Sequence, residues 1–300
     1  MNIKITADST CDLSEALLRQ WNISLIPMHI LMGEESYLDG VTIHPADVFA
    51  HAQNGGKMPK SAAPNLVEYT DFLAPFARDY DAVIHINVGS KFSSCFQNAR
   101  LAAQEFGNVY VVDSENICTG QGYLVLQAAK WALRPAPKNI SMRLQGLAKR
   151  VELSFVLNQL DYMAKSGRCS GVLAFGANIL GIKPSLAVID GELKVVRKYR
   201  GSLPICVGKY ITDQLANRED IDRSMVFISS TQAKPGCMEA IKAGLRQYGN
   251  FENVYETDIG TTIGGYSGPG TIGIVFARKE NKKSGCCTCD SHFFSLGAAF

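Results

Sequence analysis

Short apolar runs alternate with amphipathic segments through the first half of the chain. The runs at residues 3–7, 82–88 and 108–112 are rich in β-branched and apolar side chains, which predicts strands. Segments 66–78 and 118–132 are predicted as helices. Because near-continuous apolar runs are typical of strands buried on both faces, this alternation predicts an α/β fold with a doubly wound, mostly parallel, Rossmann-like sheet.

Three features near the N-terminus give more local predictions. Residues 24–32 are predicted as one strand, in which Pro27 marks an edge or a bulge. Asp12 is predicted to cap the first helix, because Glu15 follows three residues later as in a capping box. The segment 54–65, which contains several glycines and prolines, is predicted as a loop.

The run Arg134-Pro135-Ala136-Pro137 is the strongest boundary signal in the chain. Beyond it strands and helices no longer alternate regularly, and Asp190-Gly191 between two apolar runs predicts a β-hairpin. We therefore expect the second half to form an α+β domain. The predicted division is an α/β domain at residues 1–150 with a small hairpin excursion around 25–45, an α+β domain at 151–280, and a flexible tail at 281–300.

The composition excludes several classes of protein. Of the 300 residues, 46% are hydrophobic, and 30 Lys and Arg stand against 28 Asp and Glu, which gives a net charge of +2. A nearly neutral chain has no global field that attracts nucleic acid, so a general DNA or RNA binder is not expected. No apolar run reaches the roughly 18 residues of a membrane-spanning helix, and the N-terminus lacks a signal-peptide pattern. We expect a cytoplasmic protein without stable membrane insertion.

The nine cysteines favour reduced thiols. Six are scattered singly, which suits mostly buried side chains. Cys286, Cys287 and Cys289 crowd together near His292, and such residues can in principle bind a metal. These residues would supply only one half of a metal site, and they follow a polar stretch at residues 279–284. We therefore expect a flexible extension and no metal.

Motifs for nucleotide binding and for a serine nucleophile are missing. The sequence has no G-x-x-x-x-G-K-[ST] loop and no G-x-S-x-G elbow. Residues 268–273 match G-x-G-x-x-G, but a predicted strand follows instead of a helix, so we expect a tight loop and no cofactor. An enzyme acting on a small phosphorylated or hydroxylated substrate stays open as an alternative, with Asp8, Ser9 and Thr10 in the first turn.

Hydroxyl side chains gather in the turns and loops around the predicted strands. In a doubly wound sheet the carboxyl ends of the strands form the ligand crevice, so hydroxyls there suit an anion of modest charge, such as a carboxylate. The same side chains are common as helix caps and turn residues, and this second interpretation stays open. The residues concerned are Ser9, Thr10, Ser61, Ser90, Ser93, Ser94, Thr261 and Thr262.

An ordered set of motifs resembles the DegV family of bacterial fatty-acid-binding proteins. The resemblance begins at Ile5-Thr6-Ala7-Asp8-Ser9-Thr10-Cys11-Asp12-Leu13 and covers residues 1–278. The specific feature is the order of the motifs along the chain. The further motifs are Tyr37-Leu38-Asp39-Gly40, Lys60-Ser61-Ala62-Ala63-Pro64, Ser90-Lys91-Phe92-Ser93-Ser94-Cys95-Phe96-Gln97-Asn98-Ala99, Val112-Asp113-Ser114, Gly167-Arg168, Lys183-Pro184, Arg200-Gly201 and Gly264-Gly265-Tyr266-Ser267-Gly268-Pro269-Gly270.

The resemblance implies a lipid carrier that has no catalytic activity of its own. Family members hold one long-chain fatty acid in a tunnel between two domains. A separate fatty acid kinase then phosphorylates the bound carboxylate, and the acyl phosphate feeds phospholipid synthesis. The residues that the resemblance implies for binding the carboxylate are Ser61, Ser93, Ser94 and Tyr266.

The resemblance also implies where the kinase docks. Arg168 and Arg200 match basic family positions that face the kinase. Exposed arginines also form ordinary surface ion pairs, and this alternative stays open.

Two positions depart from the family pattern. Ser61 stands in place of a threonine, and Ala62 and Asn65 replace two serines of the same motif, so this loop is less polar than usual. Tyr266 stands where many kinase-linked members carry a histidine. A phenol can donate a hydrogen bond to a carboxylate, but it is not a base near neutral pH. A lipid sensor or storage protein without a kinase partner is therefore a second alternative.

Overall fold

The N-terminal sheet has four parallel strands in the order β2-β1-β6-β7. The computed structural model describes residues 1–133, 137–167, 169 and 181–280. Strand order changes direction between β1 and β6, which places a ligand crevice outside their carboxyl ends. The strands are β1 (Ile3–Asp8), β2 (Ile23–Ile26), β6 (Ala82–Asn87) and β7 (Val109–Asp113).

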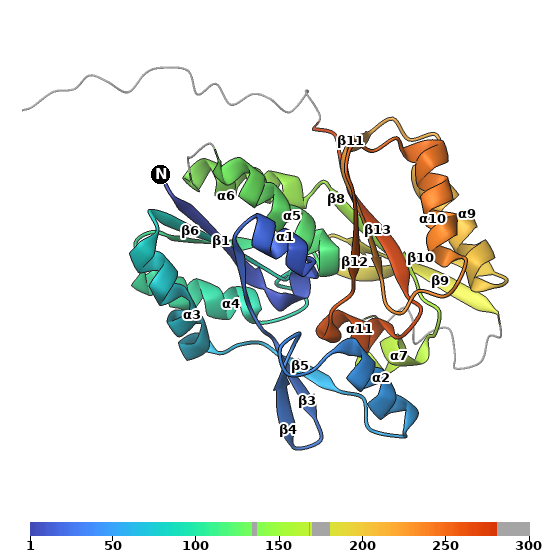
Figure 1. Cartoon of the computed structure of the whole chain (residues 1–300), viewed down its shortest axis with the longest axis horizontal. Helices are drawn as coiled ribbons and strands as arrows, with labels where there is room; N and C mark the ends of the chain where they lie inside the picture. The colour runs from blue at the N-terminus through green and yellow to red at the C-terminus, as the bar shows by residue number, and fades with distance from the viewer. Residues whose placement is uncertain (134–136, 168, 170–180, 281–300) are drawn as a thin grey trace, which may run out of the picture.

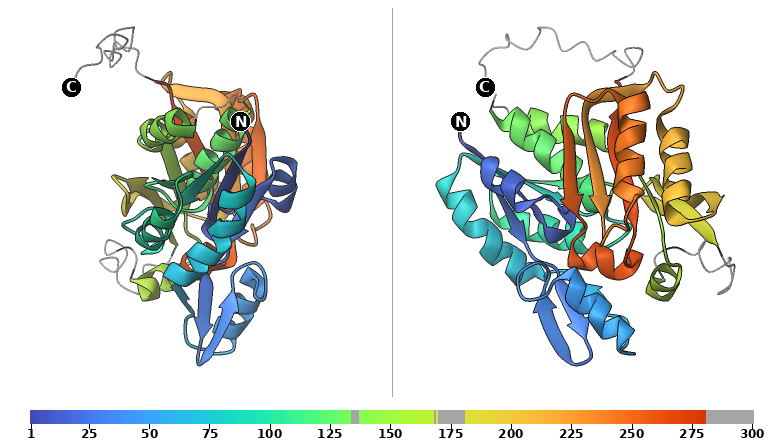
Figure 2. Two further views of the ribbon diagram at one scale, coloured as in Figure 1. Left: turned by 90° about the vertical axis from the view of Figure 1, so that its left-hand side faces the viewer. Right: turned by 45° about the vertical axis from the view of Figure 1, so that its right-hand side comes forward.

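Helices cover both faces of this sheet (Figures 1 and 2). The first face is covered by α3 (Leu66–Asp79) and α4 (Cys95–Ala102). The opposite face is covered by α5 (Cys118–Ala132) and α6 (Pro137–Ala148), while α1 (Glu15–Gln20) packs beside β2. The predicted α/β fold with a doubly wound parallel sheet is confirmed.

The second sheet has six strands in the order β10-β9-β8-β13-β11-β12, and only β11 and β12 pair in parallel. Its outer face packs against α9 (Leu203–Leu215) and α10 (Cys237–Gly244), the second of which ends in the π-helical turn η3 (Leu245–Gly249). The predicted hairpin is present as β9 and β10. The strands are β8 (Val151–Val156), β9 (Ile182–Ile189), β10 (Glu192–Arg200), β11 (Ile221–Ser230), β12 (Val254–Asp258) and β13 (Ile272–Arg278).

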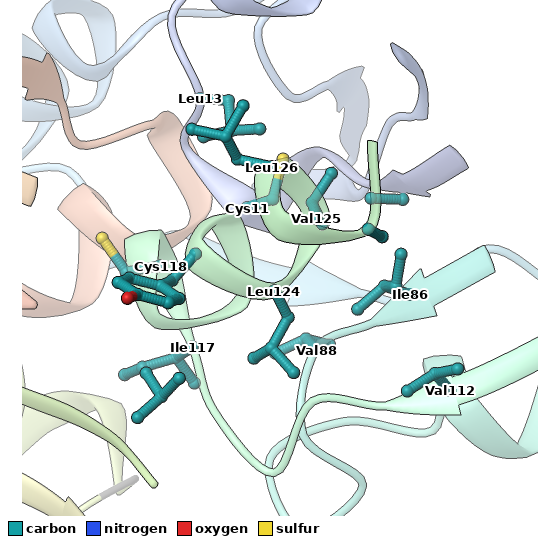
Figure 3. Close-up of a cluster of buried hydrophobic side chains, with 14 of the residues drawn as sticks. Cys11, Leu13, Ile86, Val88, Val112, Ile117, Cys118, Leu124, Val125 and Leu126 are labelled. Atoms are coloured by element: carbon teal, nitrogen blue, oxygen red, sulfur yellow. The ribbon is translucent and has the colours of Figure 1, made fainter. Parts of the chain in front are cut away.

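Helix α5 lies between the two sheets and gives them a shared core. It packs on β1 and β6 on one side and on β8, β11 and β13 on the other. All of residues 118–126 are buried, and the rings of Tyr123 and Phe227 meet edge to face with centroids 6.3 Å apart. Figure 3 shows its side chains Leu124, Val125 and Leu126 among residues from several neighbouring segments. Separating the sheets would therefore expose this helix to water.

A small three-stranded antiparallel sheet projects from the N-terminal half (Figure 2). Helix α2 (Pro45–Gln53) comes between the second and third strands of this sheet in the chain, and it packs against α11 (Thr261–Ser267) of the second half. The short helix α7 (Asp161–Ser166) packs on α11 as well, and the rings of Phe49 and Tyr162 are 5.9 Å apart. The three strands are β3 (His29–Met32), β4 (Glu35–Leu38) and β5 (Lys60–Ala62), in the order β4-β3-β5.

Several local predictions were wrong. The segment 24–32 is two strands, β2 and β3, because the chain leaves the first sheet at Pro27 and enters the small one. The segment predicted as a loop contains β5. Ser14 caps α1 in place of Asp12, which ends the short helical turn η1 (Ser9–Cys11) with a left-handed φ of 49°.

Other predictions concern single residues or lie outside the described part of the chain. The six scattered cysteines are buried and free, as expected. The predicted tail at 281–300, with Cys286, Cys287 and Cys289, lies outside the described residues. Within the described residues, every helix is too short or too polar to cross a lipid bilayer.

The close approach of α5 to η1 gives a test of the shared core. A Cβ on Gly122 would lie 2.4 Å from the carbonyl oxygen of Cys11, and neither backbone can easily move. We expect Gly122→Ala to lower the free energy of unfolding by about 1–3 kcal/mol, measured by urea denaturation. Gly146→Ala in α6 is the matched control, because a Cβ there meets nothing within 4 Å. It should be neutral or stabilise by up to about 1 kcal/mol; equal losses in both variants would contradict the close packing.

Candidate functional site

A cavity lies at the carboxyl ends of β1 and β6, where the two halves of the chain meet. Its empty volume is about 570 Å³, which includes the part open to solvent. Hydroxyl groups line part of the wall, and apolar side chains, two of them flexible methionines, form the rest. The lining residues are Thr10, Met28, Ser61, Val88, Phe92, Ser93, Ile117, Phe155, Met163, Leu193, Thr262, Ile263, Tyr266 and Ser267.

A second cavity of about 330 Å³ continues the first one between the sheets. The two cavities share Ile117, Phe155, Ile263 and Ser267 in their walls, so they adjoin. The second cavity is lined by the start of α5 and by residues of β8, β11 and β13. Hydroxyl groups gather in the wall of the first cavity, and this hydroxyl-lined part is here called the mouth.

Ser61 and Tyr266 are hydrogen-bonded to each other at the mouth of the first cavity, although 205 residues separate them in sequence. Ser61 lies on β5 and Tyr266 on α11. The N–H of Ser61 donates to Tyr266 Oη at 2.8 Å, and the two hydroxyl oxygens are also 2.8 Å apart. The small sheet and the second half of the chain are therefore joined at the cavity.

The loop between β6 and α4 brings a third hydroxyl to the same cavity. Ser93 Oγ accepts a hydrogen bond from the N–H of Cys95 at 3.3 Å and lies 3.0 Å from its thiol. Because α4 begins at Cys95, the positive end of this helix faces the same region.

The structure brings three of the four predicted carboxylate-binding residues together. Ser61, Ser93 and Tyr266 share one cavity, whereas Ser94 is exposed at the start of α4 and is not part of the wall. Thr262 also lines the cavity; it was recognised as a loop hydroxyl, but α11 was not predicted and its side of the wall was missed.

The two predicted docking arginines lie outside this cavity or outside the described residues. Arg200 is exposed at the end of β10, and Arg168 lies outside the described residues. No group of three His, Cys, Asp or Glu in the described part of the chain is placed to hold a metal ion.

Comparison with known proteins identifies the family. A model of the DegV family, described as an uncharacterised protein family, matches residues 2–279. The chain belongs to the DegV family. The resemblance found in the sequence is confirmed, and it covers both sheets and both cavities.

Individual DegV relatives match along nearly their whole length. A DegV domain-containing protein of Caldanaerobacter subterraneus is 31% identical over 92% of this chain and 99% of its own. A solved structure of a DegV family protein from Thermus thermophilus is described as showing fatty acid binding. It matches this chain with a TM-score of 0.86 at 24% identity, and the match covers 93% of this chain and 100% of the Thermus chain. A DegV lipid-binding protein from Thermotoga maritima has a TM-score of 0.81 at 25% identity, covering 94% and 100%.

Asp39 in the DegV-like motif Tyr37-Leu38-Asp39-Gly40 holds the beginning of α11. Its Oδ1 accepts from the N–H of Thr261 at 3.0 Å, and its Oδ2 accepts from the hydroxyl of Thr262 at 2.7 Å. The hydroxyl of Ser9 donates to the same Oδ2 at 2.8 Å. The first turn after β1 thereby fixes the helix that carries Tyr266.

Asp8, at the end of β1, is engaged within the protein. It is fully buried, and its carboxylate accepts from Tyr69 Oη at 2.6 Å and from the N–H of Val88 at 2.8 Å. The side-chain amide of Asn87 donates to it as well, at 3.0 Å. Asp8 thus ties β1 to β6 and α3, and it is not part of the cavity wall.

Asp12 is a second buried carboxyl group beside α11. Its Oδ1 accepts from the N–H of Gly260 at 3.0 Å, while its Oδ2 is buried without a hydrogen-bond partner. Burial raises the pKa of Asp12 well above its usual range, and the charge of Asp39 adds to this shift. A proton on Oδ2 removes the cost of burying an unpaired charge.

The raised pKa of Asp12 predicts a pH dependence of stability. Above its ordinary pKa of 3.8, the folded state keeps a proton that the unfolded state has lost, so this contribution to stability falls as pH rises. Asp12→Asn removes the titration, and we expect the variant to gain stability relative to the wild type as pH rises. Urea unfolding at a series of pH values measures this difference.

Asp79→Asn is the control with the opposite sign. Arg78 lowers the pKa of the exposed Asp79, so this variant should lose a little stability relative to the wild type as pH rises toward 3.8 from below, and the difference should stay constant at higher pH. Parallel pH profiles of the wild type and Asp12→Asn would contradict the assignment of a proton to Asp12.

Proposed function

We propose that this DegV-family protein binds one long-chain fatty acid. The acyl chain lies in the two adjoining cavities, and the carboxylate contacts Ser61, Ser93 and Tyr266. The observation that supports the proposal is a pair of adjoining cavities with hydroxyl groups in the wall of the first and mostly apolar side chains beside the shared core. Flexible Met28 and Met163 side chains in the wall can adjust to the shape of an acyl chain.

The energetics favour such a ligand. About fourteen buried methylenes at roughly 0.8 kcal/mol each give a gross gain of about 11 kcal/mol, which the ordering of the chain reduces. A buried carboxylate without partners would be very costly. No Lys, Arg or His occurs among the residues that the structure places in the cavity walls, so neutral donors must bind the head group. Hydroxyl groups and the N-terminal end of α4 supply these donors.

Relatives support the same ligand class. The Thermus thermophilus structure is described by its fatty acid binding, and the Thermotoga maritima protein is described as lipid binding. Both align with this chain over the full length of their own chains. The hydroxyl-lined cavity of this chain gives the shared fold a place for such a ligand.

Asp8 and Ser9 in the first turn are poor candidates for catalysis on a small phosphorylated or hydroxylated substrate. Asp8 is fully buried and engaged by Tyr69 and Val88. Ser9 donates to Asp39 and accepts from the N–H of Met28. Their contacts fit a structural role, so we propose a protein that carries the lipid and does not transform it.

The same proposal includes a partner in the cytoplasm. The carrier presents the carboxylate to a separate fatty acid kinase, which forms an acyl phosphate for phospholipid synthesis, and Arg200 contributes to docking. The second candidate is a sensor or storage protein without a kinase. Tyr266 favours this alternative, because a phenol cannot act as a base near neutral pH.

Lipid analysis tests the ligand directly. We expect extraction and mass spectrometry of the purified protein to find one long-chain fatty acid per chain. If the purified protein contains none and takes up none when palmitate is added, the proposed function is wrong.

Variants at the mouth test the role of the hydroxyl groups. Ser93→Ala and Tyr266→Phe each remove one donor to the carboxylate, and we expect each to weaken palmitate binding by about tenfold in Kd. Calorimetric titration measures the change. Ser94→Ala is the matched control, because Ser94 is a neighbouring serine outside the wall. Equal effects of Ser93→Ala and Ser94→Ala would place the carboxylate elsewhere.

A kinase assay separates the two candidate functions. With a DegV-linked fatty acid kinase and ATP, the carrier should support acyl phosphate formation, and Arg200→Ala should raise the KM for the carrier without changing palmitate binding. A protein that binds palmitate but forms neither a complex nor acyl phosphate would be a sensor or storage protein.

A further inference from the structure

We propose that Cys95 is a positioning residue for the hydroxyl group of Ser93. Its thiol lies within hydrogen-bonding distance of Ser93 Oγ and determines the direction in which the O–H of Ser93 points. This inference rests on the proposed function, because it concerns the side chain that would bind the carboxylate.

Cys95 contacts Ser93 from behind the cavity wall. Its thiol is fully buried and lies 3.0 Å from Ser93 Oγ and 3.3 Å from the sulfur of Met28. Ser93 and Met28 line the cavity, whereas Cys95 is not among the residues in its described wall. Cys95 can therefore influence a ligand only through these neighbours.

The thiol of Cys95 donates a hydrogen bond to the sulfur of Met28. Ser93 Oγ is its second neighbour in the cavity wall, and this oxygen also accepts from the backbone N–H of Cys95.

The thiol keeps its proton. Burial raises the pKa of Cys95 to about 12, and the charge of Asp8 adds to this effect. The single S–H proton can therefore be donated to the sulfur of Met28 or to the oxygen of Ser93. Since a thiol can also accept a hydrogen bond, Ser93 and Cys95 can exchange the roles of donor and acceptor.

This exchange gives Ser93 two settings. When the thiol donates to the sulfur of Met28, the O–H of Ser93 can donate to the sulfur of Cys95. When a carboxylate occupies the mouth, the O–H of Ser93 turns to it, and Ser93 Oγ can accept from the thiol and from the N–H of Cys95. A hydroxyl that accepts a hydrogen bond is a stronger donor, so Cys95 strengthens the contact with the carboxylate.

A double-mutant cycle tests the coupling between Cys95 and Ser93. We expect Cys95→Ala to weaken palmitate binding by about three- to tenfold, and by less than roughly twofold in the Ser93→Ala background. Cys95→Ser keeps a donor and an acceptor and should bind within roughly twofold of the wild type. A residue that only fills space would give the same loss in both backgrounds and no rescue by serine; that outcome overturns the proposal.

A measurement without lipid separates this inference from the proposed function. The S–H stretching band of Cys95 is assigned by infrared difference against Cys95→Ala, and we expect it to shift in Ser93→Ala and in Met28→Leu. An unshifted band in both variants overturns the positioning role. If the band shifts but the wild type binds no palmitate, the positioning of Ser93 is supported and the fatty-acid proposal fails.

Discussion

Helix α5 carries apolar side chains around most of its circumference, and residues 118–126 are all buried. Such a helix is stable only when other elements cover it on every side. The parallel sheet covers one side and the six-stranded sheet covers the other, so the two halves are held in one arrangement. The second cavity lies where this helix begins, with Ile117, Cys118 and Thr119 in its wall. The second cavity therefore lies at the N-terminal end of the helix that both sheets bury.

Three buried carboxyl groups then shape the mouth, and each of them binds groups of the protein. Asp8 joins β1 to β6 and α3, while Asp12 and Asp39 hold the beginning of α11. N–H and O–H donors occupy the carboxyl oxygens of Asp8 and Asp39, so these oxygens are engaged within the protein. This arrangement leaves the hydroxyl groups of Ser61, Ser93 and Tyr266 at the cavity.

The long elements could be predicted from the sequence because their apolar patterns decide their structure. The short elements could not be predicted in this way. Strand β5 has three residues and depends on pairing with β3. Helix α11 contains paired threonines and glycines, and its first N–H, that of Thr261, is held by Asp39, which is 222 residues away in sequence. Ser61, Ser93 and Tyr266 were predicted from the motifs, and the structure places all three in the wall of one cavity. The apolar wall, such as Phe155 and Leu193, was not found, since a lining residue and a core residue look alike in sequence.

A crystal structure of the protein incubated with palmitate tests the central claim most directly. The account predicts continuous density for one acyl chain through both cavities, from Ser93 to Val275, with the carboxylate within hydrogen-bonding distance of Ser61, Ser93 and Tyr266. A closed interior with side chains filling both cavities, or a lipid bound elsewhere on the surface, would contradict it.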